Sequence, residues 1–236
     1  NHIQFFRQYL ACADAYSEGK AQEDWSMLKG FIAGLLVANA FEWVAHKYVL
    51  HGTHRPGQSR HSPVPRSMRS HWEHHREVRK NQFNDESYVI GWSHWRNKNE
   101  IISLAAAAGV FGLVFFPISK GMMAGSMYSA LNYYYIHRRA HLEPEWARTK
   151  IPWHYDHHMN SNQDANWCVT KPWFDYILGT RVISSPDLQE QNPLGIALPR
   201  PLSALLNRGA EKFFPAKWVD RNEKPSPDLE PLPKAS

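Results

Sequence analysis

The sequence predicts an all-α protein, an integral-membrane helical bundle with a helical cap on the cytoplasmic side. Three observations support this fold class: apolar residues gather in three stretches, a basic polar segment separates the first two, and histidines recur at helical spacing. The 236 residues suffice for one domain with tails. The mean hydropathy of −0.55 is typical of a soluble protein, but it averages over apolar residues that are concentrated in a few places.

The three apolar stretches are residues 30–45, 101–118 and 122–136. Each is shorter than the ~20 residues of a usual spanning helix, but flanking turns extend it. A breaker-rich turn, Pro117-Ile-Ser-Lys-Gly121, predicts that the second and third stretches form a helical hairpin. Tyr133, Tyr134 and Tyr135 stand at its exit, where an aromatic belt is expected. A buried hairpin in a soluble helical protein is the alternative.

Residues 51–98 contain many arginines and few acidic residues, which predicts a cytoplasmic position for this segment. The ends of the hairpin, near Glu100 and His137, are then also cytoplasmic. Three parts are expected: an N-terminal interfacial segment at 1–25, a membrane domain at 26–182, and a soluble C-terminal tail at 183–236. Two short amphipathic helices are expected outside the membrane domain, one containing Phe5, Phe6, Tyr9 and Leu10 and one near 202–214.

The net charge of +5 is too small to indicate a nucleic-acid partner. Two cysteines, Cys12 and Cys168, cannot build a disulfide framework or a Cys-x-x-Cys metal site. The unusual feature of the composition is its 14 histidines.

Ten of these histidines fall into four clusters, which begin at His46, His71, His137 and His154. The last three clusters have a spacing that suits a helix. Residues at i, i+3 and i+4 share one helix face, so each cluster of this spacing points its imidazoles in one direction. Imidazole binds Fe, Zn, Cu or Ni, and inward-facing ligands on bundle helices are a common way to build dimetal sites. The predicted metal ligands are His46, His51, His71, His74, His75, His137, His141, His154, His157 and His158.

The first cluster fits a regular helix less simply than the others. A step of five residues rotates by about 500°, so His46 and His51 diverge on an α-helix. Gly52 predicts a helix end, with His51 at the C-cap bending back, and His54 is a competing ligand. His2, His61 and His94 have no helical register and are interpreted as surface residues.

The order His-x4-His, His-x2-His-His, His-x3-His, His-x2-His-His resembles the fatty acid hydroxylase and sterol desaturase superfamily. Its fatty acid 2-hydroxylase branch shows the same four spacings. The segment from Asn166 to Arg181 is similar to the signature that follows the last cluster in that superfamily. The resemblance covers roughly residues 30–182.

Two segments, from His46 to Gly52 and from His74 to Asp85, also resemble the carotenoid β-ring hydroxylases of the same histidine-rich class. Those enzymes have a longer third spacing and lack the Asp175…Gly179 ending. The fatty acid hydroxylase interpretation is therefore favoured, and a carotenoid ring hydroxylase and a sterol or lipid desaturase stay open as alternatives. A membrane metal transporter or buffer is the alternative that is not an enzyme.

The resemblance implies a non-haem di-iron monooxygenase that hydroxylates a C–H bond of a membrane lipid with O2. Ten imidazoles give each of two iron ions about five ligands and leave room for O2 or water. Zinc has no redox chemistry, so zinc in such a site is a substitute. The sequence contains no reductase motif, so an external ferredoxin or cytochrome is expected to supply electrons. Arg76, Arg79 and Lys80 are candidates to dock it, or to contact anionic lipid.

Four polar residues are candidates to orient the imidazoles by accepting their N–H groups: Glu42, Asp156, Asp164 and Asn166. Asp175 and Arg181 are expected to form a structural pair. The lipid tail, or plain helix packing, accounts for the apolar side chains of Phe31, Leu35, Leu36, Phe111, Phe115 and Met127.

Overall fold

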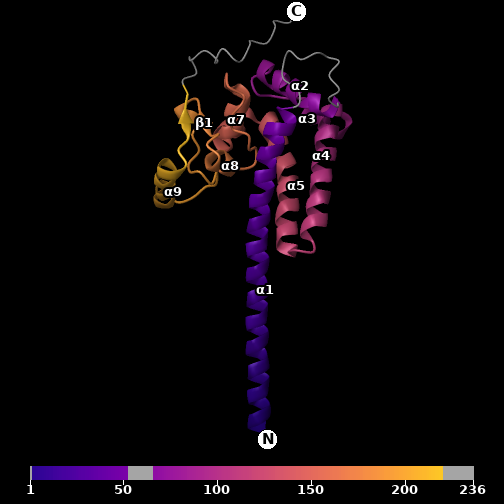
Figure 1. Cartoon of the computed structure of the whole chain (residues 1–236), viewed down its shortest axis with the longest axis vertical. Coiled ribbons are helices and arrows are strands. Elements are labelled where there is room, and N and C mark those ends of the chain that lie inside the picture. Colours follow the sequence, from indigo (N-terminus) through magenta and orange to yellow (C-terminus); the bar gives the residue numbers. More distant parts are fainter. Residues whose placement is uncertain (1, 53–65, 220–236) are drawn as a thin grey trace, which may run out of the picture. The chain divides into compact units, whose positions relative to one another are not determined.

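The computed structural model describes the backbone of residues 2–52 and 66–219, and the side chains of 20, 22–52 and 70–219 (Figure 1). Within these residues the chain is mostly helical, as the sequence predicts. Its helices are α1 (His2–Val44), the π-helix η1 (Ala45–Leu50), α2 (Arg66–Lys80), α3 (Ser87–Ile90), the 3-10 helix η2 (Gly91–Ser93), α4 (Trp95–Phe115), α5 (Lys120–Leu142), α6 (Pro144–Lys150), α7 (Pro152–Met159), α8 (Trp173–Ile177), the 3-10 helix η3 (Pro186–Leu188) and α9 (Arg200–Phe213). Two short parallel strands, β1 (Val182–Ile183) and β2 (Lys217–Trp218), pair with each other.

The chain divides into two compact units. Unit 1 comprises Asn1–Ala38 and Ala106–Ala130, and unit 2 comprises Asn39–Ala105 and Leu131–Ser236. The ten predicted ligand histidines all belong to unit 2.

Unit 1 contains the predicted hairpin. The amide of Phe116 bonds to the carbonyl of Gly112, and the amide of Ser119 bonds to that of Phe115, which ends α4 and closes the turn. Glycines let α1 approach α5 closely: a Cβ on Gly34 would overlap the carbonyl oxygen of Met122, and a Cβ on Gly125 would overlap that of Phe31. Small residues at such crossings are typical of helices packed inside a membrane.

Two helical segments are long and apolar enough to cross a membrane, Gln22–Leu50 and Trp95–Phe115. Only 22% and 11% of the residues in their apolar windows are buried, whereas the core helix of a soluble protein is mostly buried. Large apolar side chains such as Leu113, which is 82% exposed, face outward. The exposure therefore favours the membrane prediction over the soluble hairpin. The third apolar stretch lies in α5, which is not one of these two candidate spans.

The N-terminal region differs from its prediction. A short separate helix was expected within residues 1–25, but α1 continues from His2 to Val44. No proline interrupts this stretch, and isolated glycines are tolerated in a helix. The side chains of Phe5, Phe6, Tyr9 and Leu10 lie outside the described residues, as do His54 and His61.

Unit 2 is organised around α2, α5 and α7, with an apolar cluster that includes Val78, Phe83, Ala140 and Trp153. The segment after residue 182 belongs to this unit as far as it is described. Leu188 is fully buried, and α9 matches the amphipathic helix expected near 202–214.

The prediction that Asp175 and Arg181 form a pair is wrong, because each side chain has other partners. Arg181 is fully buried, and its guanidinium donates to the carboxylate of Glu190, with Nη2 2.5 Å from Oε2. Asp175 instead accepts the backbone amides of Trp167 and Cys168 at 2.8 and 2.9 Å. Asp175 lies six residues before Arg181 and Glu190 lies nine residues after it, so proximity in sequence favoured Asp175.

We expect Gly34→Ala and Gly125→Ala to lower the thermal stability of the purified protein in detergent, because each added methyl group meets a backbone carbonyl that cannot move aside easily. Gly109→Ala is the matched control, since nothing lies within 4 Å of its added Cβ. Equal melting temperatures for all three variants would contradict the close helix crossing.

Candidate metal centre

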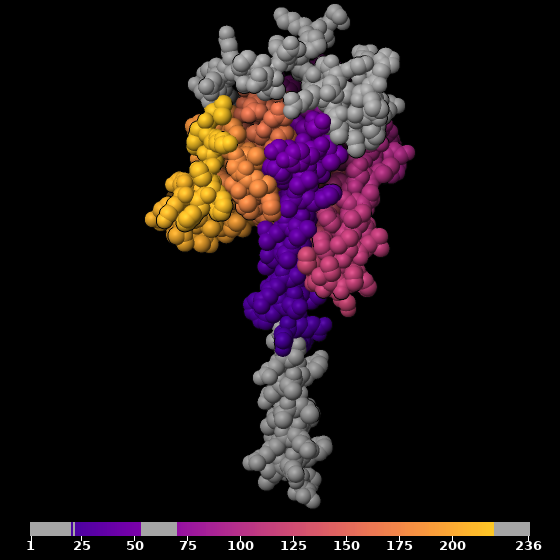
Figure 2. Space-filling view, in the orientation of Figure 1, coloured from indigo at the N-terminus to yellow at the C-terminus, as the bar shows by residue number. Residues whose placement is uncertain are grey.

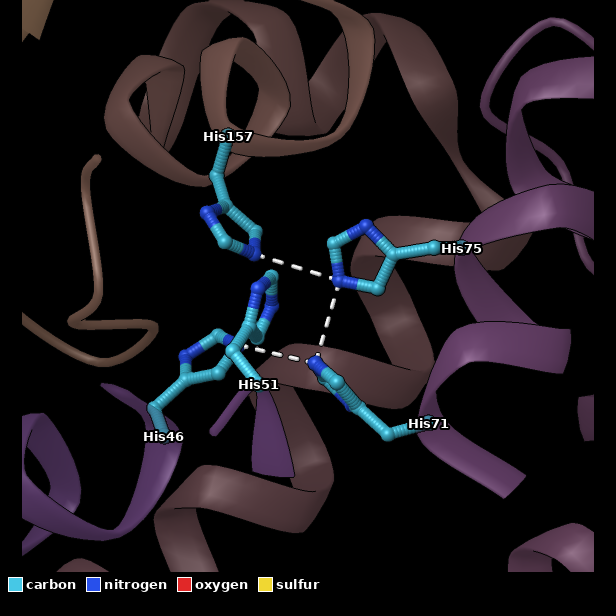
Figure 3. Close-up of side chains that lie close together, drawn as sticks. All are labelled: His46, His51, His71, His75 and His157. Atoms are coloured by element: carbon cyan, nitrogen blue, oxygen red, sulfur yellow. Dashed lines mark hydrogen bonds between the residues drawn. The ribbon is translucent and has the colours of Figure 1, made fainter. Parts of the chain in front are cut away.

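The ten predicted ligand histidines are brought together in the interior of unit 2. None is more than 9% exposed. Two sets have ligand nitrogens that all lie within 4.8 Å of one another. Group 1 consists of His46, His51, His71, His75 and His157 (Figure 3). Group 2 consists of His74, His137, His141 and His158.

His154, the tenth predicted ligand, lies beside group 2. Its Nε2 atom is 3.3 Å from the Nε2 of His141. The structure therefore assembles five imidazoles at one point and four, with a fifth adjacent, at the other.

The two His-x2-His-His clusters each serve both groups, which differs from the single locus expected for each. On α2, His71 and His75 belong to group 1 and His74 belongs to group 2. On α7, His157 belongs to group 1, whereas His158 belongs to group 2. Adjacent residues on a helix diverge by about 100°, so one helix can supply ligands to two neighbouring ions.

A π-helical turn explains how His46 and His51 reach the same group. The amide of His51 bonds to the carbonyl of His46 at 3.0 Å, an i→i+5 bond that aligns residues five apart. Their ring centroids are 5.1 Å apart, and His51 is the C-cap residue, as predicted. π-turns inside helices are frequent at functional sites.

The Nε2 atoms of group 1 form a chain of close contacts. The Nε2 of His71 is 3.0 Å from that of His46 and 3.0 Å from that of His75. The Nε2 of His157 lies 3.2 Å from the Nε2 of His75. Figure 3 shows these rings pointing toward a common centre from the helices that carry them.

Oxygen atoms behind five of the ten rings determine where those imidazoles carry their proton. In group 1, the Nδ1 of His46 is 2.5 Å from the carbonyl oxygen of Trp167, and the Nδ1 of His157 is 2.7 Å from that of Ala165. A carbonyl oxygen only accepts, so both Nδ1 atoms must be the donors. A neutral imidazole has one N–H, and the inward Nε2 of each ring therefore carries a lone pair.

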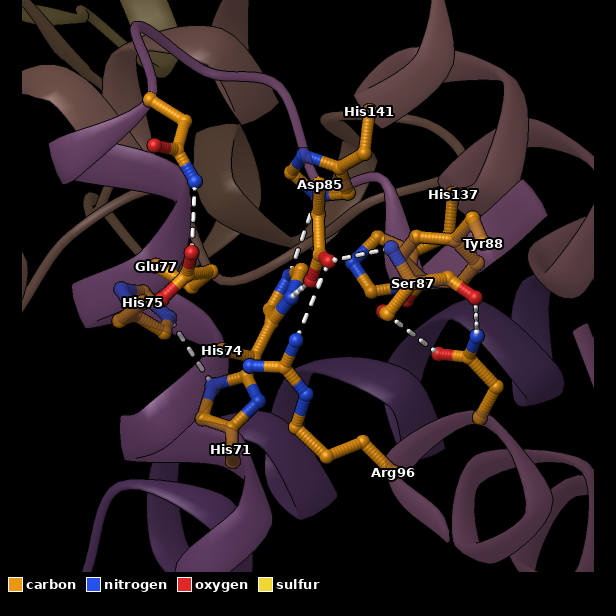
Figure 4. Close-up of polar contacts among 12 residues, drawn as sticks. His71, His74, His75, Glu77, Asp85, Ser87, Tyr88, Arg96, His137 and His141 are labelled. Carbon is orange, nitrogen blue, oxygen red and sulfur yellow. Dashed lines mark hydrogen bonds and ion pairs between the residues drawn. The ribbon is translucent and has the colours of Figure 1, made fainter. Parts of the chain in front are cut away.

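Three rings of group 2 have the same arrangement with different acceptors, and Figure 4 shows one of these pairs, His74 with Asp85. The Nδ1 of His74 is 3.0 Å from Oδ2 of Asp85, and the Nδ1 of His137 is 2.6 Å from Oε1 of Glu100. The Nδ1 of His141 is 3.0 Å from the carbonyl oxygen of Phe83. Each of these three rings thus also directs its Nε2 lone pair inward.

Facing lone pairs in group 2 are the strongest indication that this group suits a cation. The Nε2 atoms of His74 and His141 are 3.1 Å apart, and neither has a hydrogen to share with the other. Two such lone pairs repel unless a positive ion lies between them. Nitrogen ligands about 2.1 Å from one ion and at right angles are separated by about 3.0 Å, close to the contacts seen in both groups.

Some backbone strain accompanies the acceptor carbonyls. Phe83 has a φ of 78° and Asn166 a φ of 58°, in the left-handed region that bulky residues rarely adopt. Phe83 supplies the oxygen for His141, and Asn166 lies between the two residues whose carbonyls accept from group 1. These two positive-φ residues therefore lie at or beside the carbonyls that accept from the predicted ligand histidines.

Burial keeps the ligand histidines neutral. It lowers the pKa of His71, His75, His157 and His158 well below the usual value, and neighbouring imidazoles add to the effect. The pKa of Asp85 would be raised by burial, but bonds from His74 and Ser87 and the charge of Arg96 hold it well below its ordinary range. Neutral imidazole is the form that binds a metal.

The four candidates for orienting the imidazoles have other contacts. Glu42 accepts the amides of Val169 and Thr170, not a histidine N–H. Asn166 bonds to Arg181 and to Val182.

Of the remaining two candidates, Asp156 has other contacts and Asp164 lies beside His51. Asp156 accepts from the amide and hydroxyl of Ser184 and lies 3.7 Å from Arg181. Asp164 comes nearest to the expected role, with Oδ1 3.8 Å from the Nδ1 of His51, beyond hydrogen-bond distance.

The acceptors actually used were missed by sequence reasoning. Backbone carbonyls leave no residue signature, so Phe83, Trp167 and Ala165 could not have been found. Asp85 and Glu100 could have been considered. Asp85 lies ten residues after His75, and Glu100 stands at the start of an apolar stretch where a carboxylate requires a partner.

Two further sets of predicted residues are placed by the structure. Arg79 is half-buried and donates to the carbonyls of His158 and Asn160, so only Arg76 and Lys80 of the proposed docking residues are exposed.

The six apolar candidates for lipid contact lie in unit 1. There Phe31 packs against Tyr128, and Phe111 stacks on Phe115.

Comparisons with protein-family models, curated proteins and solved structures find no match for this chain.

We expect the metal-free protein to lose thermal stability as the pH falls from 7.5 to 5.5. The unfolded chain takes up protons on its histidines near pH 6.5, whereas the folded chain resists protonation because burial lowers these pKa values. Stability is therefore greatest above about pH 6.5 and declines below it. Thermal unfolding in detergent at the two pH values measures this, and an unchanged or higher melting temperature at pH 5.5 would refute it.

Proposed function

We propose that this protein is a membrane di-iron oxygenase that hydroxylates a C–H bond of a lipid, a fatty acyl chain or a related molecule. The observation that carries the proposal is the pair of facing Nε2 lone pairs of His74 and His141 within one of two adjacent, buried histidine groups. Both groups suit a first-row transition metal bound by imidazole.

The donor set favours a redox metal over a structural one. Structural zinc sites are usually tetrahedral and commonly contain cysteine, whereas these groups are built of histidine alone and hold up to five imidazoles each. Iron bound here would supply the oxidising power that O2 needs to attack an unactivated C–H bond. One oxygen atom enters the lipid as a hydroxyl group, and two electrons and two protons convert the other to water.

The side chains of the protein contribute position and environment to this reaction. Carbonyls and carboxylates behind five of the rings hold those imidazoles in the orientation of a ligand. Full burial of His141, His154, His157 and His158 keeps bulk water away from the centre, which protects a reactive oxidant from side reactions.

The two candidate membrane spans support a lipid as the substrate, since a molecule dissolved in the bilayer is at high local concentration beside them. The order and spacing of the clusters, which resemble the fatty acid hydroxylase and sterol desaturase superfamily, support the reaction class. A carotenoid ring hydroxylase and a desaturase need the same centre and differ in substrate or outcome. An external ferredoxin or cytochrome would supply the electrons at the cytoplasmic side.

A metal transporter or buffer is the second candidate function. Transport requires ligands spread along a path, whereas the ten ligand histidines named above are gathered in one buried place within unit 2. The arrangement therefore supports a tightly held dimetal centre.

We expect the protein, purified in detergent after growth with iron, to contain close to two metal ions per chain. Mass spectrometry of the metal content measures this ratio. A ratio near zero, or a loose spread of metals removed by dialysis, would favour transport or buffering instead.

We expect His74→Ala, His137→Ala and His157→Ala each to abolish lipid hydroxylation and to lower the metal content, because each removes a ligand from one group. The assay supplies a reductant and ¹⁸O2 and looks for one labelled oxygen in a lipid product. His94→Ala is the matched control, since His94 belongs to neither group. Full activity in the three ligand variants would disprove the proposed centre.

A further inference from the structure

The two histidine groups differ in what stands behind their ligands, and this difference has a chemical consequence. In group 1 the acceptors within hydrogen-bond distance are the carbonyl oxygens of Trp167 and Ala165. In group 2 two of the three acceptors are the carboxylates of Asp85 and Glu100. Only Phe83 contributes a carbonyl there.

Each carboxylate is itself held firmly. Asp85 is 1% exposed, and its Oδ1 accepts from the amide of Ser87 at 3.0 Å and from Arg96 at 3.1 Å. Glu100 accepts the hydroxyl of Tyr88 at 2.7 Å on the oxygen that His137 does not use. Neither carboxylate can turn away from its histidine without leaving these donors unpaired.

The charges near the two groups are correspondingly different. Asp85 and Glu100 place two negative charges directly on ligand N–H groups of group 2, and Arg96 offsets one of them. The nearest acid to a group 1 ring is Asp164, which is 3.8 Å from His51 and 46% exposed. Solvent screens that charge, so it affects group 1 less.

We propose that the two metal positions are inequivalent, and that Asp85 and Glu100 are positioning residues which make group 2 the tighter site. A carboxylate that accepts the N–H of a ligand imidazole draws the proton toward itself and makes the opposite nitrogen a stronger donor. A neutral carbonyl does so less. Group 2 therefore fills first and better stabilises the more highly charged ion of a mixed-valence pair. This inference rests on the proposed dimetal centre.

The test is a titration of the full-length, metal-free protein in detergent with Zn²⁺, a probe without redox chemistry, in competition with a chelator of known affinity. We expect two separate dissociation constants. His141→Ala should remove the tighter step, and His46→Ala should remove the weaker one, which assigns each step to its group. A single constant shared by both ions would overturn the inference.

Near-isosteric variants then test the two carboxylates. We expect Asp85→Asn and Glu100→Gln each to weaken the tighter step by about 10- to 100-fold and to leave the weaker step unchanged. Asp164→Asn is the comparison variant and should leave the tighter step unchanged, because Asp164 lies beside His51 of group 1. Unchanged tight binding in both variants, or a larger effect from Asp164→Asn, would overturn the role of these residues.

Circular dichroism of each variant checks that the helices persist, and the second carboxylate variant keeps the test decisive if the first one fails to fold. The outcomes also separate this inference from the proposed function. Two equally tight ions would refute the inequivalence and leave the dimetal centre intact. A wild-type protein that binds no stoichiometric Zn²⁺ would refute both.

Discussion

The arrangement of unit 2 depends on one interaction, the hydrogen bond from the outer nitrogen of a buried imidazole to a fixed oxygen. That bond determines which nitrogen carries the proton and therefore which nitrogen can bind a cation. Without it, a ring in the interior could rotate or change tautomer and present an N–H to the centre. His46, His74 and His137 illustrate three kinds of acceptor: a backbone carbonyl, an aspartate and a glutamate. Dense burial then keeps the rings neutral, since a protonated imidazole has no water to stabilise its charge.

A second layer of buried acids holds the acceptors themselves. Asp175 accepts the amides of Trp167 and Cys168, and Glu42 accepts those of Val169 and Thr170. This fixes the loop whose carbonyl at Trp167 receives the N–H of His46. Glu42 lies one helical turn before His46, so a single helix carries both a ligand and the residue that anchors that ligand's acceptor. These carboxylates act on the centre through the backbone.

The helical hairpin and the histidine centre obey different packing rules. In unit 1 glycines allow backbones to touch, and large apolar side chains remain exposed, which suits helices surrounded by lipid. In unit 2 many polar side chains are buried, and some of them are paired, as with Arg181 and Glu190. The same chain thus combines two helices that are long and apolar enough to cross a membrane with an interior that gathers histidines.

The sequence by itself predicted the helical class, the hairpin and the ten histidines that the structure gathers in unit 2. These features depend on local periodicity, which is a property of neighbouring residues. Only the tertiary structure decided how the ten histidines divide between two groups, since His74 and His75 are adjacent in sequence but serve different centres. It also decided that a π-turn aligns His46 with His51, and that Asp85 and Glu100 lie behind the rings where Asp156 and Asn166 had been expected. These features depend on contacts between segments far apart in the chain and on backbone carbonyls, and neither can be inferred from the residue types alone.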